Sequence, residues 1–140
     1  MNPMQIDPIQ PPGWAAPKGY SNGMLVTGGG SMLFIAGQVA WDAQQQLVGE
    51  GDFVRQFTKA LENVASVLTE AGGRVEHIVR MTLYLTDCAT YLDCQKEVGA
   101  AYRSIMGKHF PAMSAVQVAA LMEPGALLEI EATAVLPAIE

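Results

Sequence analysis

The chain has 140 residues, of which half are apolar and 16% are charged, so it can bury the core of one globular domain and has too little material for a second. Eight basic against fourteen acidic residues give a net charge of −6, which repels a phosphate backbone and argues against nucleic acid as a partner. Because so apolar a small domain would expose part of its apolar surface as a monomer, we expect a homo-oligomer.

The first eighteen residues differ from the rest of the chain. Five prolines lie between Met1 and Pro17, with little hydrophobic periodicity. We therefore expect residues 1–18 to run extended over the surface before a single domain at residues 19–140. No basic segment precedes an apolar stretch, and no run approaches the ~20 apolar residues of a membrane span. A soluble cytoplasmic protein without a membrane partner is expected.

Two short apolar segments follow. Residues 24–27 and 32–38 are rich in apolar and branched side chains, which predicts strands, and the glycine-rich stretch 28–31 between them predicts a hairpin turn. In a phosphate-binding loop the glycines would be followed by a helix, whereas a second strand is expected here. These glycines are thus expected to shape a turn and not to bind phosphate.

The next segment has the clearest helical pattern. Asp52 is expected to cap a helix, and Gly72-Gly73 to end it. Apolar residues recur in it at spacings of three and four: Val54, Phe57, Leu61, Val64 and Leu68. This stripe needs a sheet to cover, and residues 78–86 predict a strand. Four of its apolar residues should share one face: Val79, Met81, Leu83 and Leu85.

The remaining elements define the fold class. A second helix is expected at residues 90–106, followed by strands at 114–121 and 127–136. This order predicts an α+β domain in which a mixed sheet has both helices on one face. Because the other face also needs cover, we expect a second subunit there. A pocket between the subunits would be lined by side chains that point away from the helices.

The last strand offers the best candidate for chemistry. A period of two sends one apolar set toward the helices, namely Leu128, Ile130, Ala132 and Ala134. Glu129 and Glu131 then share the opposite face, where a carboxylate covered by a neighbour could act as a general base. The alternative is an ordinary solvated strand face.

Other polar residues are weaker candidates for a site. Tyr20, just ahead of the first expected strand, could close a pocket or simply lie in the core or at its rim. Arg80 could form an ion pair with an acid of another subunit. The histidines, His77 and His109, have no third ligand at metal-binding spacing, so no metal site is expected.

Several motifs in a fixed order resemble the Rid (reactive intermediate deaminase, YjgF-type) family. They span residues 19–136 and comprise Gly19-Tyr20-Ser21, Ile35-Ala36-Gly37-Gln38, Leu61-Glu62-Asn63-Val64, residues 78–87, Phe110-Pro111-Ala112 and Leu128-Glu129-Ile130-Glu131-Ala132. The resemblance implies a chorismate-mutase-like fold and a homotrimer with pockets at its subunit interfaces. It also implies hydrolysis of enamines and imines to a keto acid and ammonia without a cofactor. By position, Glu129 matches the water-positioning glutamate of the family, and Tyr20 matches an aromatic residue of the pocket wall.

The chain departs from the family at the substrate-binding positions. Met113 stands directly after Phe110-Pro111-Ala112, where the family has an arginine that holds the substrate carboxylate, and Ala115 replaces a frequent cysteine. Gln95 or Lys96 is nearest to the family asparagine. A thioether offers neither charge nor donor, so we expect an altered substrate range.

Two functions follow from this comparison. The first is deamination of an enamine or imine at the clefts between subunits, with the substrate range changed by Met113. The alternative is a non-catalytic trimer of the same fold that binds a small metabolite or a partner. Family members are also described as ribonucleases, but the acidic charge argues against that activity here.

Overall fold

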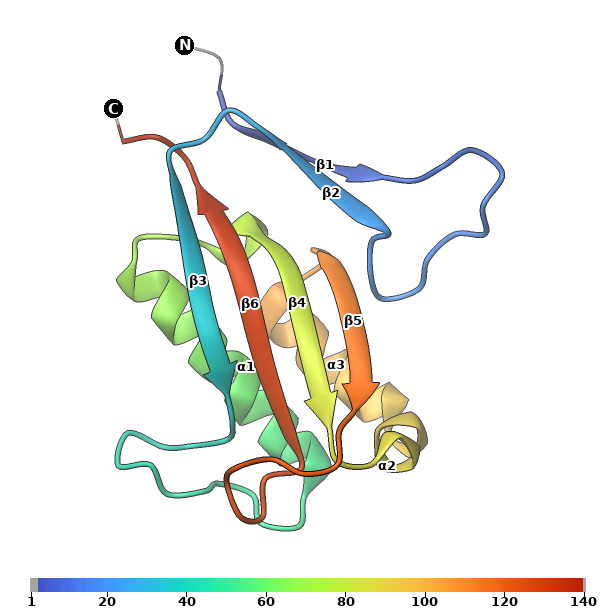
Figure 1. The fold of residues 1–140 in the computed structure, drawn as a ribbon, viewed down its shortest axis with the longest axis vertical. Helices are drawn as coiled ribbons and strands as arrows, with labels where there is room; N and C mark the ends of the chain where they lie inside the picture. The colour runs from blue at the N-terminus through green and yellow to red at the C-terminus, as the bar shows by residue number, and fades with distance from the viewer. Residues whose placement is uncertain (1–2, 140) are drawn as a thin grey trace.

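The computed structural model describes residues 3–139, which begin with three strands and end with two, with helices between them (Figure 1). A short 3₁₀ helix, Val75–His77, precedes the central strand. The strands are β1 (Gln5–Ile9), β2 (Gly23–Thr27), β3 (Ser31–Gln38), β4 (Ile78–Leu85), β5 (Ala112–Gln117) and β6 (Leu128–Leu136). The helices are α1 (Phe53–Glu70), α2 (Cys88–Asp93) and α3 (Gln95–Met106). No helix in the described part of the chain is long and apolar enough to cross a bilayer.

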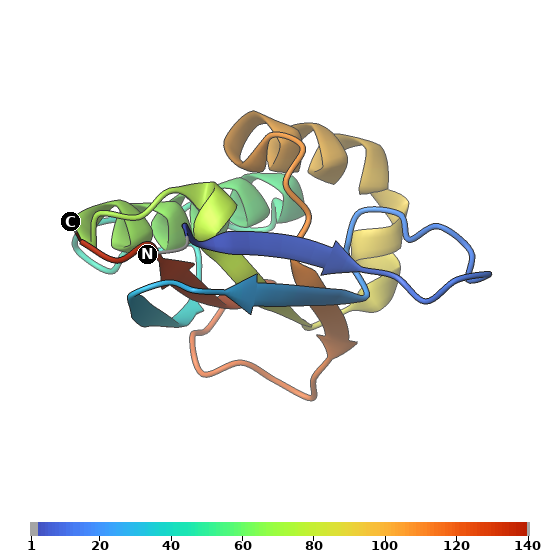
Figure 2. The same ribbon diagram turned by 90° about the horizontal axis from the view of Figure 1, so that it is seen from above.

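Four strands form the main sheet, in the order β3-β6-β4-β5. β6 runs antiparallel to both β3 and β4, whereas β4 and β5 run parallel. The long helices α1 and α3 cover one face of this sheet, as Figures 1 and 2 show. The prediction of an α+β fold with a mixed sheet and helices on one face is therefore confirmed.

Helix α1 forms where its pattern predicts it. The Asp52 side chain accepts the backbone N–H of Arg55 at 3.1 Å, which satisfies one of the free donors at the helix start. The apolar stripe lies against the sheet, with Phe57, Leu61 and Leu68 buried. Gly72 takes a positive φ of 84° just past the helix end, a conformation that favours glycine.

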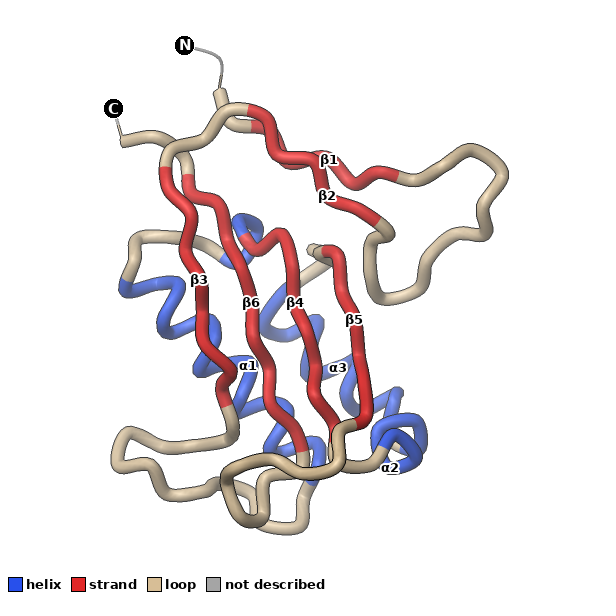
Figure 3. Tube along the Cα trace, viewed as in Figure 1, coloured by secondary structure: helices blue, strands red, loops and turns tan. Residues whose placement is uncertain are grey.

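The predicted hairpin between β2 and β3 is wrong. β2 pairs with β1, and β3 pairs with β6, so the glycines join two different sheets (Figure 3). Gly30 donates its N–H to the carbonyl of Leu136 at 2.9 Å, and a Cβ at this glycine would lie 2.6 Å from the Cα of Ala138. The glycines therefore allow the chain to pass close to the C-terminal segment at the sheet edge. Local sequence indicates strands and turns, but it does not decide which strand becomes the partner.

Residues 3–18, expected to run over the surface ahead of the domain, contribute a strand to the fold. β1 and β2 form a two-stranded sheet, here called the ribbon, which lies across one end of the main sheet (Figure 1). At one end the N–H of Ser21 donates to the carbonyl of Pro111 at 3.0 Å, and Ser21 pairs with Ala112. At the other end Gly30 bonds to Leu136. The ribbon is thus attached to the main body at both of its ends.

Two element boundaries and the side that one residue faces also differ from the prediction. The single helix expected at residues 90–106 is two helices, because Cys94 has a ψ of 30° that interrupts the helical backbone. β5 begins at Ala112 and ends at Gln117, where its pairing with β4 ends. A register shift between Ile78 and Arg80 buries Ile78, so Val79 does not share the core face with Met81 as predicted.

Candidate active site

The outward face of the sheet, away from the helices, presents the two predicted carboxylates. On β6, Leu128 and Ile130 are fully buried against the helices, which confirms the predicted alternation. Glu129 and Glu131 are half-buried on the opposite face. Across the strands, Tyr84 pairs with Glu129.

Glu129 lies in a space that exists because residue 37 is glycine. A Cβ added to Gly37 would lie 2.7 Å from Cδ and 2.9 Å from Cγ of Glu129, well inside van der Waals contact. Within residues 3–139 the Glu129 carboxylate accepts no hydrogen bond and forms no ion pair. It is therefore free to accept a proton from a bound water.

The second carboxylate is held in place. The Tyr84 hydroxyl donates to Oε1 of Glu131 at 2.5 Å, and this hydrogen bond raises the pKa of Tyr84. The phenol keeps its proton, so its one donor is occupied by Glu131. The two glutamates thus differ: Glu131 is part of the structure, and Glu129 is available for chemistry. Sequence reasoning missed both Gly37 and Tyr84, although a glycine inside a strand indicates a close approach.

Tyr20 and Met113 line a common shallow hollow of about 190 Å³ beside the start of β5. Ser21 fixes Tyr20 there through its bonds to Pro111 and to the carbonyl of Phe110. Tyr20 remains 40% exposed, as an aromatic residue at a pocket rim would be. Arg80 lines the same hollow from β4.

Met113 also lines a second hollow, on the helix side of the sheet. This hollow of about 260 Å³ includes Gln95 and Gly99 of α3. Met113 pairs with Met81, which is buried, and this pairing places the two side chains on the same face. Ala115 is exposed on β5, which is an edge strand of the main sheet. The structure therefore brings Met113 together with Tyr20 on one side and with Gln95 on the other.

Glu129 is remote from Met113 within one chain. Met113 is level with Met81 and Glu129 is level with Tyr84, a separation of about 10 Å along the strands at ~3.3 Å per residue. β4 lies between them, which adds about 10 Å across the sheet. Met113 and Glu129 also point to opposite faces. Neither of the two hollows that Met113 lines includes Glu129.

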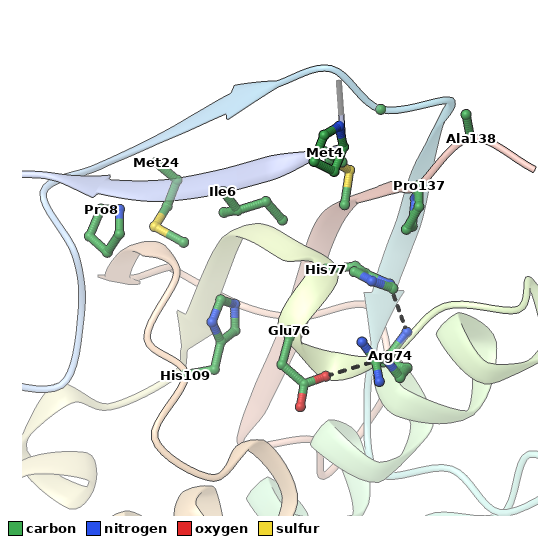
Figure 4. Close-up of a pocket in the computed structure, with 12 residues that line it drawn as sticks. Met4, Ile6, Pro8, Met24, Arg74, Glu76, His77, His109, Pro137 and Ala138 are labelled. Atoms are coloured by element: carbon green, nitrogen blue, oxygen red, sulfur yellow. Dashed lines mark hydrogen bonds and ion pairs between the residues drawn. The ribbon is translucent and has the colours of Figure 1, made fainter. Parts of the chain in front are cut away.

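A larger hollow than these two lies elsewhere, under the ribbon (Figure 4). It measures about 590 Å³, and apolar residues of the ribbon and of the segment just before it, such as Ile6 and Met4, face His77 and His109 across it. Arg74 also lines it, with its Nε 4.0 Å from Oε2 of Glu76. None of the five predicted site residues lies in this hollow.

The two histidines of this hollow are not arranged to bind a metal. Nδ1 of His77 accepts the backbone N–H of Arg74 at 3.0 Å, so the neutral ring has its proton on Nε2. Burial lowers the pKa of His77, which favours this neutral form. Nε2 of His109 lies 2.7 Å from the carbonyl of Ile78 and must donate to it. Neither Nε2 is then a metal ligand, and residues 3–139 hold no group of three His, Cys, Asp or Glu side chains suited to a metal.

Comparison with known proteins gives a consistent result. Residues 13–136 match the model of the endoribonuclease L-PSP family. A RutC family protein of Synechocystis is 38% identical over 87% of this chain and 90% of its own length. The human 2-iminobutanoate/2-iminopropanoate deaminase is 31% identical over 93% of this chain and 88% of its own length. Among solved structures, the Rid family protein YyfB of Yersinia pestis superimposes with a TM-score of 0.81 at 36% identity, over 94% of this chain and 98% of YyfB. The YjgF gene product of E. coli gives 0.63 at 31% identity, over 83% and 87%.

Proposed function

Because this chain belongs to the YjgF/Rid/RutC family of the endoribonuclease L-PSP model, we propose that it hydrolyses the C=N bond of an enamine-derived imine. Water is added and ammonia is released, which leaves a carbonyl compound. The observation that supports this most directly is the Glu129 carboxylate, which is half-buried, accepts no hydrogen bond among residues 3–139 and lies in the space left by Gly37. The named deaminases among the relatives provide the reaction type.

The reaction needs little from the protein. Glu129 accepts a proton from a water molecule as the water oxygen bonds to the imine carbon and the C=N π electrons move to nitrogen. Glu129 then returns this proton to the nitrogen, which gives a neutral carbinolamine. The resulting carbinolamine then loses ammonia as its hydroxyl becomes the carbonyl, so atoms and charges balance. Holding water and imine in contact supplies most of the rate gain. The chemistry requires no cofactor.

We further propose that the site forms between subunits of a homotrimer. Met113 and Glu129 lie on opposite faces of the sheet, so a second copy of the chain is needed to bring a Met113 side chain and a Glu129 carboxylate into one site. The outward face also has large apolar side chains to cover, with Phe34 72% and Met32 61% exposed on β3. Burying such side chains contributes about 1.5–3 kcal/mol each.

Met113 is proposed to alter the substrate range. The flexible thioether provides an apolar pocket wall in place of a fixed cation, and Ala115 adds no polar group. Met113→Arg should accordingly raise activity on small imino acids by supplying a bidentate contact to the carboxylate. Unchanged activity would show that the rest of the pocket has also diverged.

The test is the decay of imines generated in situ by an amino-acid oxidase, followed by trapping with semicarbazide and by ammonia release. The wild-type chain should accelerate decay of at least one imine, and Glu129→Gln should abolish the acceleration while oligomer mass and melting temperature stay close to wild type. Glu131→Gln is the matched control, since it removes a carboxylate that Tyr84 holds in place. Loss of the oligomer in Glu129→Gln would mark Glu129 as structural.

A second candidate is a non-catalytic trimer that binds a metabolite or a partner. The replacement of the family arginine by Met113 favours it. It predicts that no imine decays faster than in buffer, while a small ligand raises the melting temperature of the oligomer. Measuring decay and ligand-induced stabilisation on one sample separates the two functions.

A further inference from the structure

Arg80 is a cation on the same sheet face as Glu129. It lies near the start of β4 and is exposed. Register places it beside Ala112 of β5, one residue before Met113. Strand alternation turns Met113 toward the helices and Arg80 away from them. A guanidinium is therefore present next to position 113, but on the outward face of the sheet.

The guanidinium of Arg80 has no partner within the described residues. The one side-chain ion pair there joins Arg74 to Glu76. Glu131, on the neighbouring strand, accepts the hydroxyl of Tyr84 instead. A planar cation with five donors is thus left open for an anion from outside the chain.

Arg80 also lies between two hollows of the outward face. One is the hollow of about 190 Å³ that it shares with Tyr20 and Met113. The other, of about 380 Å³, is lined by Arg80, Phe34 and Glu131 among others. Arg80 therefore borders both the hollow that contains Tyr20 and the hollow that contains Glu131.

We propose that Arg80 binds the carboxylate of the substrate in place of the arginine that Met113 replaces. The inference rests on the proposed function and keeps its substrates within the imines of 2-amino acids, in which the carboxylate is bonded to the imine carbon. Met113 then changes which side chains these substrates carry, and not whether they carry a carboxylate. Arg80 is level with Thr133 and Glu129 with Tyr84, about 13 Å apart along the strands in one chain. This is a separation of backbones, and we expect the inter-subunit site proposed above to bring the Arg80 guanidinium and a Glu129 carboxylate to the two ends of one small imino acid.

Binding of the product class tests this without requiring turnover. The probe is 2-oxobutanoate, titrated by calorimetry, with uncharged butanone as the comparison. Arg80→Gln should weaken 2-oxobutanoate binding about 10- to 100-fold, the loss expected for a charge-assisted bidentate contact, and leave butanone unaffected. The affinity of Arg80→Lys for 2-oxobutanoate should lie between those of wild type and Arg80→Gln, because an ammonium is a point charge and lacks the two parallel donors of a guanidinium. Arg74→Gln is the matched control and should bind as wild type.

Equal binding of 2-oxobutanoate by wild type and Arg80→Gln would overturn the proposal. Dissociation of the oligomer in Arg80→Gln would also overturn it, in favour of an ion pair between subunits. If 2-oxobutanoate binding depends on Arg80 and no imine is hydrolysed, the proposed reaction fails and the anion site stands. If imines are hydrolysed equally well by Arg80→Gln, the anion site fails and the reaction stands.

Discussion

Replacing Gly37 by alanine should displace the carboxylate of Glu129, the proposed general base, without unfolding the protein. The new Cβ would lie 2.7 Å from Cδ and 2.9 Å from Cγ of Glu129. Favourable carbon contacts need about 3.5–4.0 Å, so the Glu129 side chain has to move by roughly 1 Å. A displacement of that size at a reacting group can cost about 100-fold in rate. We therefore expect kcat/KM for imine hydrolysis to fall about 100-fold.

The stability of the same variant should change little. Alanine in a strand is favoured over glycine by about 0.5–1 kcal/mol because the unfolded chain loses freedom. A displaced Glu129 rotamer costs about 0.5–1.5 kcal/mol. These two contributions nearly cancel, and the melting temperature should stay within about 4 °C of wild type, measured at one protein concentration.

The assay compares kcat/KM and melting temperature of Gly37→Ala with those of Glu129→Gln and Gly23→Ala. Gly23 is the control because it is also a strand glycine, but the nearest atom to an added Cβ is Ile9 Cβ at 3.5 Å, an ordinary contact. Wild-type kcat/KM in Gly37→Ala, together with an inactive Glu129→Gln, would refute the argument that Gly37 positions this carboxylate. Unfolding of Gly37→Ala would show that the space is needed for the fold.

Three further predictions concern stability, each measured by urea unfolding at a fixed protein concentration. Gln56 is buried, donates to two backbone carbonyls and accepts the N–H of Leu127. Gln56→Leu should therefore lower the free energy of unfolding by about 3 kcal/mol. A decrease below ~1 kcal/mol would contradict a stabilising role of these hydrogen bonds. Asp52→Ala removes the cap on Arg55 N–H and should cost about 1 kcal/mol, with Asp52→Asn close to neutral. Burial lowers the pKa of His77 below 6.5, so its stabilising contribution is present above pH 6.5 and lost as pH falls through the lowered value. In His77→Gln the free energy of unfolding should therefore decrease less below pH 6.5 than in wild type. Parallel plots of the free energy of unfolding against pH for wild type and His77→Gln would exclude His77 as the titrating group.

Local patterns predicted much of this fold. The spacing of apolar residues and the capping Asp52 located α1, because helix periodicity and capping depend on residues that are close in sequence. Alternation along β6 placed Glu129 on the outward face for the same reason, since a strand turns every second side chain to one side. Where the backbone departs from regular geometry, as at Cys94 or at the register shift beside Ile78, these patterns were not sufficient.

What the sequence determined by itself is therefore the kind of most elements, the side that the residues of regular segments such as β6 face, and the identity of the candidate residues Glu129, Tyr20 and Met113. Tertiary structure decided which of them lie together, because strand pairing and register depend on residues far apart in the chain. The glycines after β2 suited a hairpin, yet β6 is the partner of β3 and β1 that of β2. Register against β4 likewise placed Arg80 beside the start of β5 and set Glu129 apart from Met113. Only the assembled sheet shows that the guanidinium of Arg80 and the carboxylate of Glu129 lie on the same face.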